Sequence, residues 1–111
     1  MGISRDELKA FMEAQRVEYG QALPGKVEAL EGLWAQVRAG DESKLKEFER
    51  AAHSIYGASG TYGFREVSGH AAALENVAQE ALEAGGTLSP EQMEKITQVL
   101  AALRLSLPTP P

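Results

Sequence analysis

The sequence predicts an all-α protein, and three observations support that prediction. Alanine, leucine and glutamate, which are strong helix formers, provide 43 of the 111 residues. Valine, isoleucine and threonine, which favour strands, total only 13. Apolar residues recur every three or four positions in segments that are separated by glycine or proline. This pattern favours an antiparallel four-helix bundle, with an additional N-terminal helix or a kinked long first helix.

The first helical segment should begin near Arg5, because Ser4 and Glu7 have the spacing of a capping box. Its apolar positions include Leu8, Met12, Tyr19, Leu23, Val27, Leu30, Trp34 and Val37. Pro24 interrupts the helical hydrogen bonds, so we expect either one long kinked helix or a short helix followed by a longer one. Gly40 should end the segment. Three large side chains could cover either the core or a partner: Phe11, Met12 and Trp34.

The remaining segments have equally clear limits. Asp41 should cap the second helix, which ends at Gly63. The third helix runs from about residue 64 to residue 84 and stops at Gly85-Gly86. The fourth begins with a capping box at residues 89–92. The three apolar stripes are Leu45, Phe48, Ala52, Ile55, Ser59 and Tyr62, then Val67, Ala71, Leu74, Ala78 and Ala81, then Met93, Ile96, Leu100 and Leu103.

Composition excludes several functions. Without cysteine, the chain has no disulfide, thiol nucleophile or zinc-thiolate site. Its net charge of −5 argues against nucleic acid or anionic lipid as a partner. There is no apolar run of about 18 residues and no signal peptide, so we expect a soluble, cytoplasmic protein with no membrane partner. The length fits one domain, residues 1–107, and the proline-rich residues 108–111 are a free tail or the start of a linker.

The second helix contains an anomaly, because it keeps its apolar stripe but includes two interior glycines, Gly57 and Gly60. Each costs roughly 1 kcal/mol relative to alanine. At about 100° per residue, His53 lies roughly 130° from the centre of the apolar stripe and should face solvent. Both glycines lie on the His53 face, four and seven residues further along. They would leave bare backbone beside an exposed imidazole, which another protein could approach closely.

These residues resemble the histidine phosphotransfer domain, most closely the version at the start of chemotaxis-type histidine kinases. The resemblance is carried by residues 51–55 (Ala-Ala-His-Ser-Ile), by residues 74–76 (Leu-Glu-Asn), and by Gly57, Gly60, Thr61, Tyr62, Gly63 and Phe64. The Gly40-Asp41 break before the histidine helix also fits the family. The resemblance implies a four-helix bundle whose exposed histidine carries a phosphoryl group.

The resemblance also implies a role for individual residues. His53 matches the phosphoacceptor, Gly57 the adjacent glycine, and Glu75 the glutamate that orients the histidine. The partners would be a response-regulator receiver domain, a histidine kinase catalytic domain, or both. We expect a monomeric phosphocarrier that is not itself an enzyme and has no ATP site. It would need no cofactor or metal of its own, since Mg²⁺ would be held by the partner.

The chain departs from the family pattern at two positions. The usual cation three residues after the histidine is replaced by Tyr56, which can donate a hydrogen bond but carries no charge. Arg50 and Lys46 lie on roughly the same side of the helix and could contact phosphate or partner instead. The second histidine of the chemotaxis type is also absent, since Ala72 stands at its position. We interpret His70 as a surface or boundary residue and predict no metal site.

Three alternatives remain. A degenerate relative could bind a kinase or receiver domain as a regulator or adaptor without being phosphorylated, and Tyr56 favours that interpretation. A plain helical adaptor or dimerisation bundle would have no need for glycines beside an exposed histidine. A metal-dependent or hydrolytic enzyme is disfavoured, because His53 has no serine or cysteine partner at a useful spacing.

Overall fold

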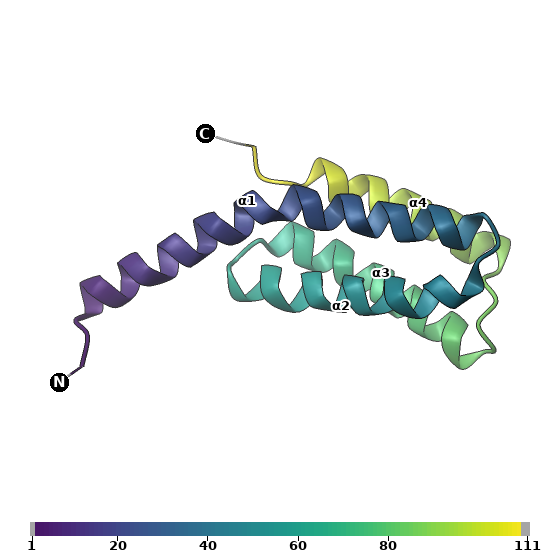
Figure 1. Ribbon diagram of the computed structural model, residues 1–111, viewed down its shortest axis with the longest axis horizontal. Coiled ribbons are helices and arrows are strands. Elements are labelled where there is room, and N and C mark those ends of the chain that lie inside the picture. Colours follow the sequence, from purple (N-terminus) through teal and green to yellow (C-terminus); the bar gives the residue numbers. More distant parts are fainter. Residues whose placement is uncertain (1, 110–111) are drawn as a thin grey trace.

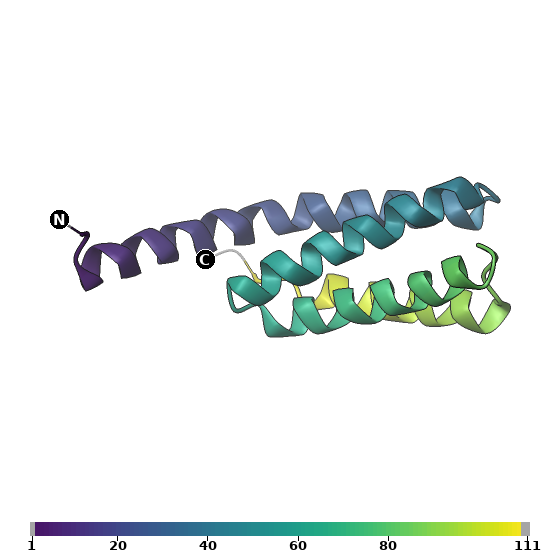
Figure 2. The ribbon, with the colours of Figure 1, turned by 90° about the horizontal axis from the view of Figure 1, so that it is seen from below.

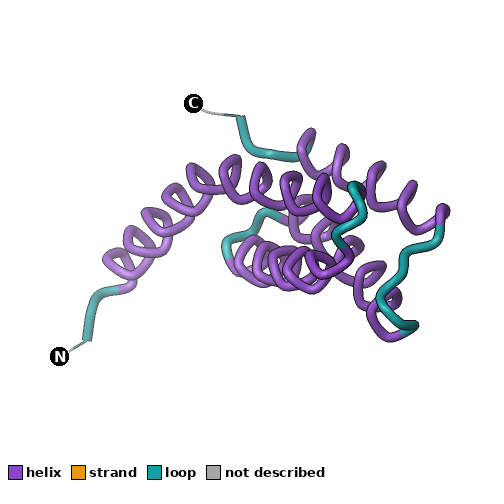
Figure 3. Tube along the Cα trace, turned by 45° about the vertical axis from the view of Figure 1, so that its right-hand side comes forward, coloured by secondary structure: helices purple, strands orange, loops and turns teal. Residues whose placement is uncertain are grey.

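The computed structural model describes residues 2–109 and confirms the all-α fold. Its helices are α1 (Arg5–Arg38), the short 3₁₀ turn η1 (Glu42–Lys44), α2 (Leu45–Thr61), α3 (Arg65–Glu83) and α4 (Pro90–Leu105). The C-terminal half of α1 packs with α2, α3 and α4 into an antiparallel bundle (Figure 1). The connections between helices are short (Figure 3). Within the described range, no helix has the length and hydropathy needed to span a membrane.

The helices begin and end largely where the sequence predicts. Ser4 accepts a hydrogen bond from the backbone N–H of Glu7 at 3.0 Å. Ser89 and Gln92 form the complete reciprocal capping box at the start of α4. Four glycines have positive φ angles at or after helix ends, a conformation that glycine adopts without steric cost. They are Gly40, Gly63, Gly85 and Gly86.

The prediction that Asp41 caps the second helix is wrong. The 3₁₀ turn η1 separates Asp41 from α2, and the Asp41 side chain caps no backbone N–H. Its carboxylate accepts the hydroxyl hydrogen of Ser43 instead. Helix α2 therefore starts after Lys44 without a side-chain cap. Because η1 lies between Asp41 and Leu45, the Asp41 side chain is too far along the chain to reach the first turn of α2.

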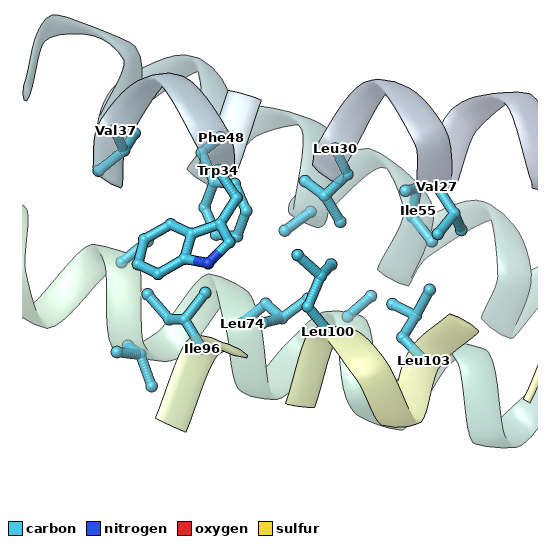
Figure 4. Packing of buried hydrophobic residues seen from close by; sticks show 14 of the residues in the cluster. Val27, Leu30, Trp34, Val37, Phe48, Ile55, Leu74, Ile96, Leu100 and Leu103 are labelled. Carbon is cyan, nitrogen blue, oxygen red and sulfur yellow. The ribbon is translucent and has the colours of Figure 1, made fainter. Parts of the chain in front are cut away.

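The core lies between the four helices and is made of aliphatic and aromatic side chains (Figure 4). Trp34 of α1 packs against Phe48 of α2, with ring centroids 5.8 Å apart. The Trp34 indole N–H donates to Oγ1 of Thr97 on α4 at 3.3 Å, so the one polar atom of this ring has a partner. The other fully buried large residues are Leu23, Leu30, Leu45, Leu74, Ile96 and Leu103.

Phe48 and Phe11 allow a matched test of this core. Phe48 is completely buried, whereas Phe11 is 59% exposed. We expect Phe48→Ala to lower the free energy of unfolding by about 3–5 kcal/mol, because it removes apolar contacts and leaves a cavity. That is a large share of the ~5–15 kcal/mol typical of a domain. Phe11→Ala should change it little, and urea denaturation of both variants would check the difference.

Helix α1 is a single helix that continues through Pro24, which settles the alternatives left by the sequence. Its N-terminal part projects beyond the ends of α2 and α3 as an arm, residues 5–18 (Figure 2). Leu8, Phe11 and Met12 on this arm are exposed, so they do not contribute to the core, whereas Trp34 does. A residue that keeps the helical period is buried only where other helices lie alongside it, and among residues 2–109 no helix packs against the part of the arm that carries Leu8, Phe11 and Met12.

The base of the arm is held to the turn between α2 and α3. Arg16 donates from Nε to the carbonyl oxygen of Tyr62 at 3.1 Å, and its guanidinium lies 4.7 Å from the centre of the Phe64 ring. Tyr19 lies against Tyr62, with ring centroids 5.3 Å apart. Burial, with Tyr62 nearby, raises the pKa of Tyr19 above its ordinary value. These contacts fix where the arm leaves the bundle.

Residues 107–109 lie against the bundle near α1. Leu107 packs against the core, and Pro108 and Thr109 line a cleft together with Gly20 and Phe64 of the same end of the bundle. A Cβ added at Gly20 would come within 3.2 Å of the Phe64 ring, so glycine permits this close approach. Residues 110 and 111 of the predicted tail lie outside the described residues.

Candidate functional site

His53 occupies the solvent-facing side of α2. The neighbouring residues Ala52 and Ile55 point into the core, with 0% and 3% of their surface exposed. The helical period then turns His53 outward, and 66% of its side chain is exposed. The imidazole is therefore presented on a surface that another protein can reach, as the helical geometry predicts.

Glu75 of α3 lies directly beside this imidazole. Its Oε1 is 2.7 Å from Nδ1 of His53, and only 15% of the Glu75 side chain is exposed. The adjacent Leu74 is completely buried, which anchors this turn of α3 in the core. The structure thus brings together two residues that are 22 positions apart in the sequence.

The contact with Glu75 decides which ring nitrogen is available for chemistry. An ionised carboxylate can only accept hydrogen bonds, so Nδ1 of the neutral ring must carry the proton. Nε2 then holds the free lone pair, and among residues 2–109 it has no hydrogen-bond partner. The pair therefore leaves Nε2 as an exposed nucleophile.

The two glycines near His53 have different surroundings. A Cβ built on Gly57 would meet nothing within 4 Å, so the surface one turn beyond His53 is open. A Cβ on Gly60 would lie 3.2 Å from Oγ of Ser68 on α3, so the space at Gly60 is taken up by helix packing. Ser68 was not singled out from the sequence. The available signal was its position seven residues before Glu75, which places both residues on one side of α3.

The polar residues predicted around His53 all lie on the outer surface of α2. Tyr56 is 43% exposed, and its ring centroid lies 6.4 Å from that of His53. Arg50 and Lys46 are exposed, and neither forms an ion pair within residues 2–109. Lys44 is instead engaged by Glu47 at 3.3 Å. Two cations near His53 thus remain free to meet an anionic group.

The other candidate features are not part of this site. His70 is partly buried on α3, and its side chain forms no hydrogen bond or ion pair within the described residues. Residues 2–109 contain no group of three or more His, Asp or Glu side chains that could hold a metal ion. His53 and Glu75 line neither the hollow between α3 and α4 nor the cleft formed by Gly20, Phe64, Pro108 and Thr109. The His53 imidazole therefore lies on an open surface and not in a pocket.

The fold is a helical bundle that presents a carboxylate-paired histidine to solvent, and comparison with known families identifies the class of protein. The family model described as the Hpt domain matches residues 6–106. The chain therefore belongs to the Hpt domain family, whose members are phosphocarriers that interact with receiver or kinase domains in two-component signalling. No curated protein and no solved structure gives a significant match.

Proposed function

We propose that Nε2 of His53 accepts a phosphoryl group from one partner and passes it to the aspartate of a receiver domain. The Nε2 lone pair attacks phosphorus, and the P–O bond to the donor breaks. The electron pair of that bond stays on the donor oxygen, which belongs either to ADP or to an aspartate carboxylate. In the onward step, a receiver carboxylate attacks phosphorus, the P–N bond breaks, and its electrons return to Nε2.

The His53–Glu75 contact is the observation that carries this proposal. While Nε2 forms its bond to phosphorus, the ring becomes positively charged and Nδ1 keeps its proton. The Glu75 carboxylate, 2.7 Å from Nδ1, stabilises that charge without taking part in bond making. Before phosphorylation the contact is a hydrogen bond from a neutral ring, which contributes only about 0.5–1.5 kcal/mol to folding, so stability alone is a weak reason for its presence.

The surroundings of His53 support a role shared with a partner. Gly57 leaves the surface beside the ring open, and Arg50, Lys46 and the Tyr56 hydroxyl can approach phosphoryl oxygens. We expect the divalent cation that shields the phosphate to be held by the receiver or the kinase. The position of Glu75 matches that of the chemotaxis type, and we propose that subclass for the domain.

Direct phosphorylation tests the proposal. The protein is incubated with phosphoramidate, a small phosphoryl donor that reacts with imidazoles, and is then mixed with a receiver domain and Mg²⁺. We expect a label on residue 53 that is labile in acid and stable in base, followed by its transfer to the receiver. A protein that binds the receiver but is never labelled at residue 53 would contradict the proposal.

That contrary result would favour the second candidate, a degenerate Hpt domain that binds a receiver or kinase without carrying phosphate. Tyr56 is the observation behind this candidate, because it supplies no charge where the family usually has a cation. The variant Tyr56→Lys separates the two. If the domain is an active carrier, it is labelled with Tyr56 in place and lysine should speed transfer modestly, whereas a domain made inactive by the missing cation should be labelled only when lysine is present.

Gly57→Ala tests the importance of the open surface. The methyl group would meet no other atom within 4 Å, so we expect the variant to be more stable by up to ~1 kcal/mol. Transfer to a receiver should nevertheless slow, because the added group stands where the partner approaches. Gly69→Ala is the control, since Gly69 is also an exposed helical glycine with open surroundings. Equal transfer rates in the two variants would argue against the access role.

A further inference from the structure

The contact between α2 and α3 is made mostly of side chains that do not fix a unique alignment. Its buried residues are small or aliphatic, as shown by Ala52 and Ile55 on α2 and by Val67, Ala71 and Ala78 on α3. Such surfaces attract each other without directional preference. The distance between Glu75 and His53 depends on how far α3 is shifted along α2, so something must define that alignment.

Within the described residues, two side-chain hydrogen bonds join these helices. One is the contact between His53 and Glu75. In the other, the hydroxyl of Ser68 on α3 donates to the backbone carbonyl oxygen of Tyr56 on α2 at 3.0 Å. Ser68 is only 9% exposed, so this second bond is partly shielded from water. A shielded hydrogen bond costs more to break than an exposed one, because the freed groups cannot turn to solvent.

Ser68 and Glu75 are connected rigidly through α3. Seven residues separate them, which corresponds to about 10.5 Å along the helix and only about 20° around it. Both side chains therefore face α2. A shift of α3 by one residue would move Glu75 by about 1.5 Å, which is enough to break its 2.7 Å contact with His53. The same shift would break the Ser68 bond.

Gly60 leaves space for the Ser68 hydroxyl. A Cβ at this position would lie 3.2 Å from Oγ and 4.0 Å from Cβ of Ser68. The Ser68 hydroxyl thus passes over the bare Cα of Gly60 to reach the Tyr56 carbonyl. The second glycine in α2 is explained in this way by its contact with α3, whereas Gly57 faces open space.

We propose that Ser68 is a positioning residue that sets the alignment of α3 on α2 and so holds Glu75 against Nδ1 of His53. Gly60 provides the room that Ser68 requires. One expected effect rests on the proposed function, namely that losing the Ser68 bond should slow phosphoryl transfer. The positioning itself can be measured in the unphosphorylated protein.

The direct test is Ser68→Ala, observed by ¹⁵N NMR of histidine-labelled protein at a pH where the ring is neutral. In the wild type we expect the His53 proton to reside mainly on Nδ1. In Ser68→Ala the share of the Nε2–H tautomer should rise, and transfer should slow by about tenfold or more, since small displacements of reacting groups have effects of up to about 100-fold. Unchanged tautomers in a folded Ser68→Ala protein would overturn the proposal.

Ser59→Ala is the matched control. Ser59 is also a buried serine, but its hydroxyl donates to carbonyls of its own helix, to that of Ile55 and, at 3.5 Å, to that of Tyr56, so it does not join α2 to α3. Its loss should lower stability while leaving the His53 tautomers as in the wild type. If both serine variants change the tautomers equally, the effect is a general loosening and the positioning role is wrong.

Gly60→Ala is a second test of the positioning role, because it keeps the Ser68 hydroxyl but displaces it. We expect it to shift the His53 tautomers as Ser68→Ala does, whereas Gly69→Ala should not. In the double variant Gly60→Ala/Ser68→Ala the two effects should not add, because they act through one contact. Additive effects would contradict the proposal. Absence of phosphorylation in the wild type would leave these NMR results intact and would count only against the proposed function.

Discussion

His53→Gln is expected to abolish phosphoryl uptake from phosphoramidate and from any phosphorylated receiver. Glutamine keeps the size and polarity of the side chain but has no nitrogen with a free lone pair, so it cannot form the bond to phosphorus. Because 66% of the His53 side chain is exposed, the replacement should leave the fold and its thermal stability nearly unchanged. The measurement is the amount of acid-labile label per protein molecule.

His70→Gln is the control for this experiment. His70 is the other histidine of the chain, lies on α3, and has no role in the proposed site. Its replacement should leave the labelling of residue 53 as in the wild type. If His53→Gln retained its label and His70→Gln lost it, the assignment of the phosphoacceptor would be refuted.

Glu75→Gln should have the second-largest effect. The amide can accept or donate a hydrogen bond, so it no longer requires the proton to be on Nδ1, and it cannot balance the charge of the phosphorylated ring. By analogy with other groups that orient a reactive histidine, we expect phosphorylation to slow by about 10- to 100-fold. The rate of label incorporation under identical donor concentrations would measure this loss.

In Glu75→Gln, we expect activity to fall while stability stays nearly unchanged. The partner His53 is largely exposed, so the free energy of unfolding should change by no more than about 1 kcal/mol. Glu83→Gln, at the far end of the same helix, should alter neither property, since Glu83 is exposed and makes no ion pair within residues 2–109. A Glu75→Gln protein that is phosphorylated at the wild-type rate would refute the orienting role.

The sequence alone was sufficient for much of the fold, since the relevant signals are local. Helix periodicity, the capping serines Ser4 and Ser89, and glycines with positive φ depend on residues within one or two turns of each other. The local pattern failed at Asp41, where a 3₁₀ turn replaces the expected cap. It also could not show that Leu8 and Met12 are exposed, because burial depends on which other helices lie alongside.

The candidate site also depends partly on local sequence signals and partly on the tertiary structure. Periodicity was enough to place His53 on the outer face of α2, because that face is determined by the neighbouring residues Ala52 and Ile55. The contact of His53 with Glu75, by contrast, requires α2 and α3 to meet at one alignment, and residues 22 positions apart carry no local signal of distance. The resemblance to a known family suggested the pair, and the tertiary structure shows the distance.

The two glycines of α2 show what only the tertiary structure decided. In sequence they look equivalent, because both lie on the His53 side of the helix and each has the same cost in helix propensity. In the folded protein Gly57 faces open space, while Gly60 lies under the Ser68 hydroxyl. The physical reason is that a helix determines only the direction in which a residue points, whereas the neighbouring helix determines what that residue meets.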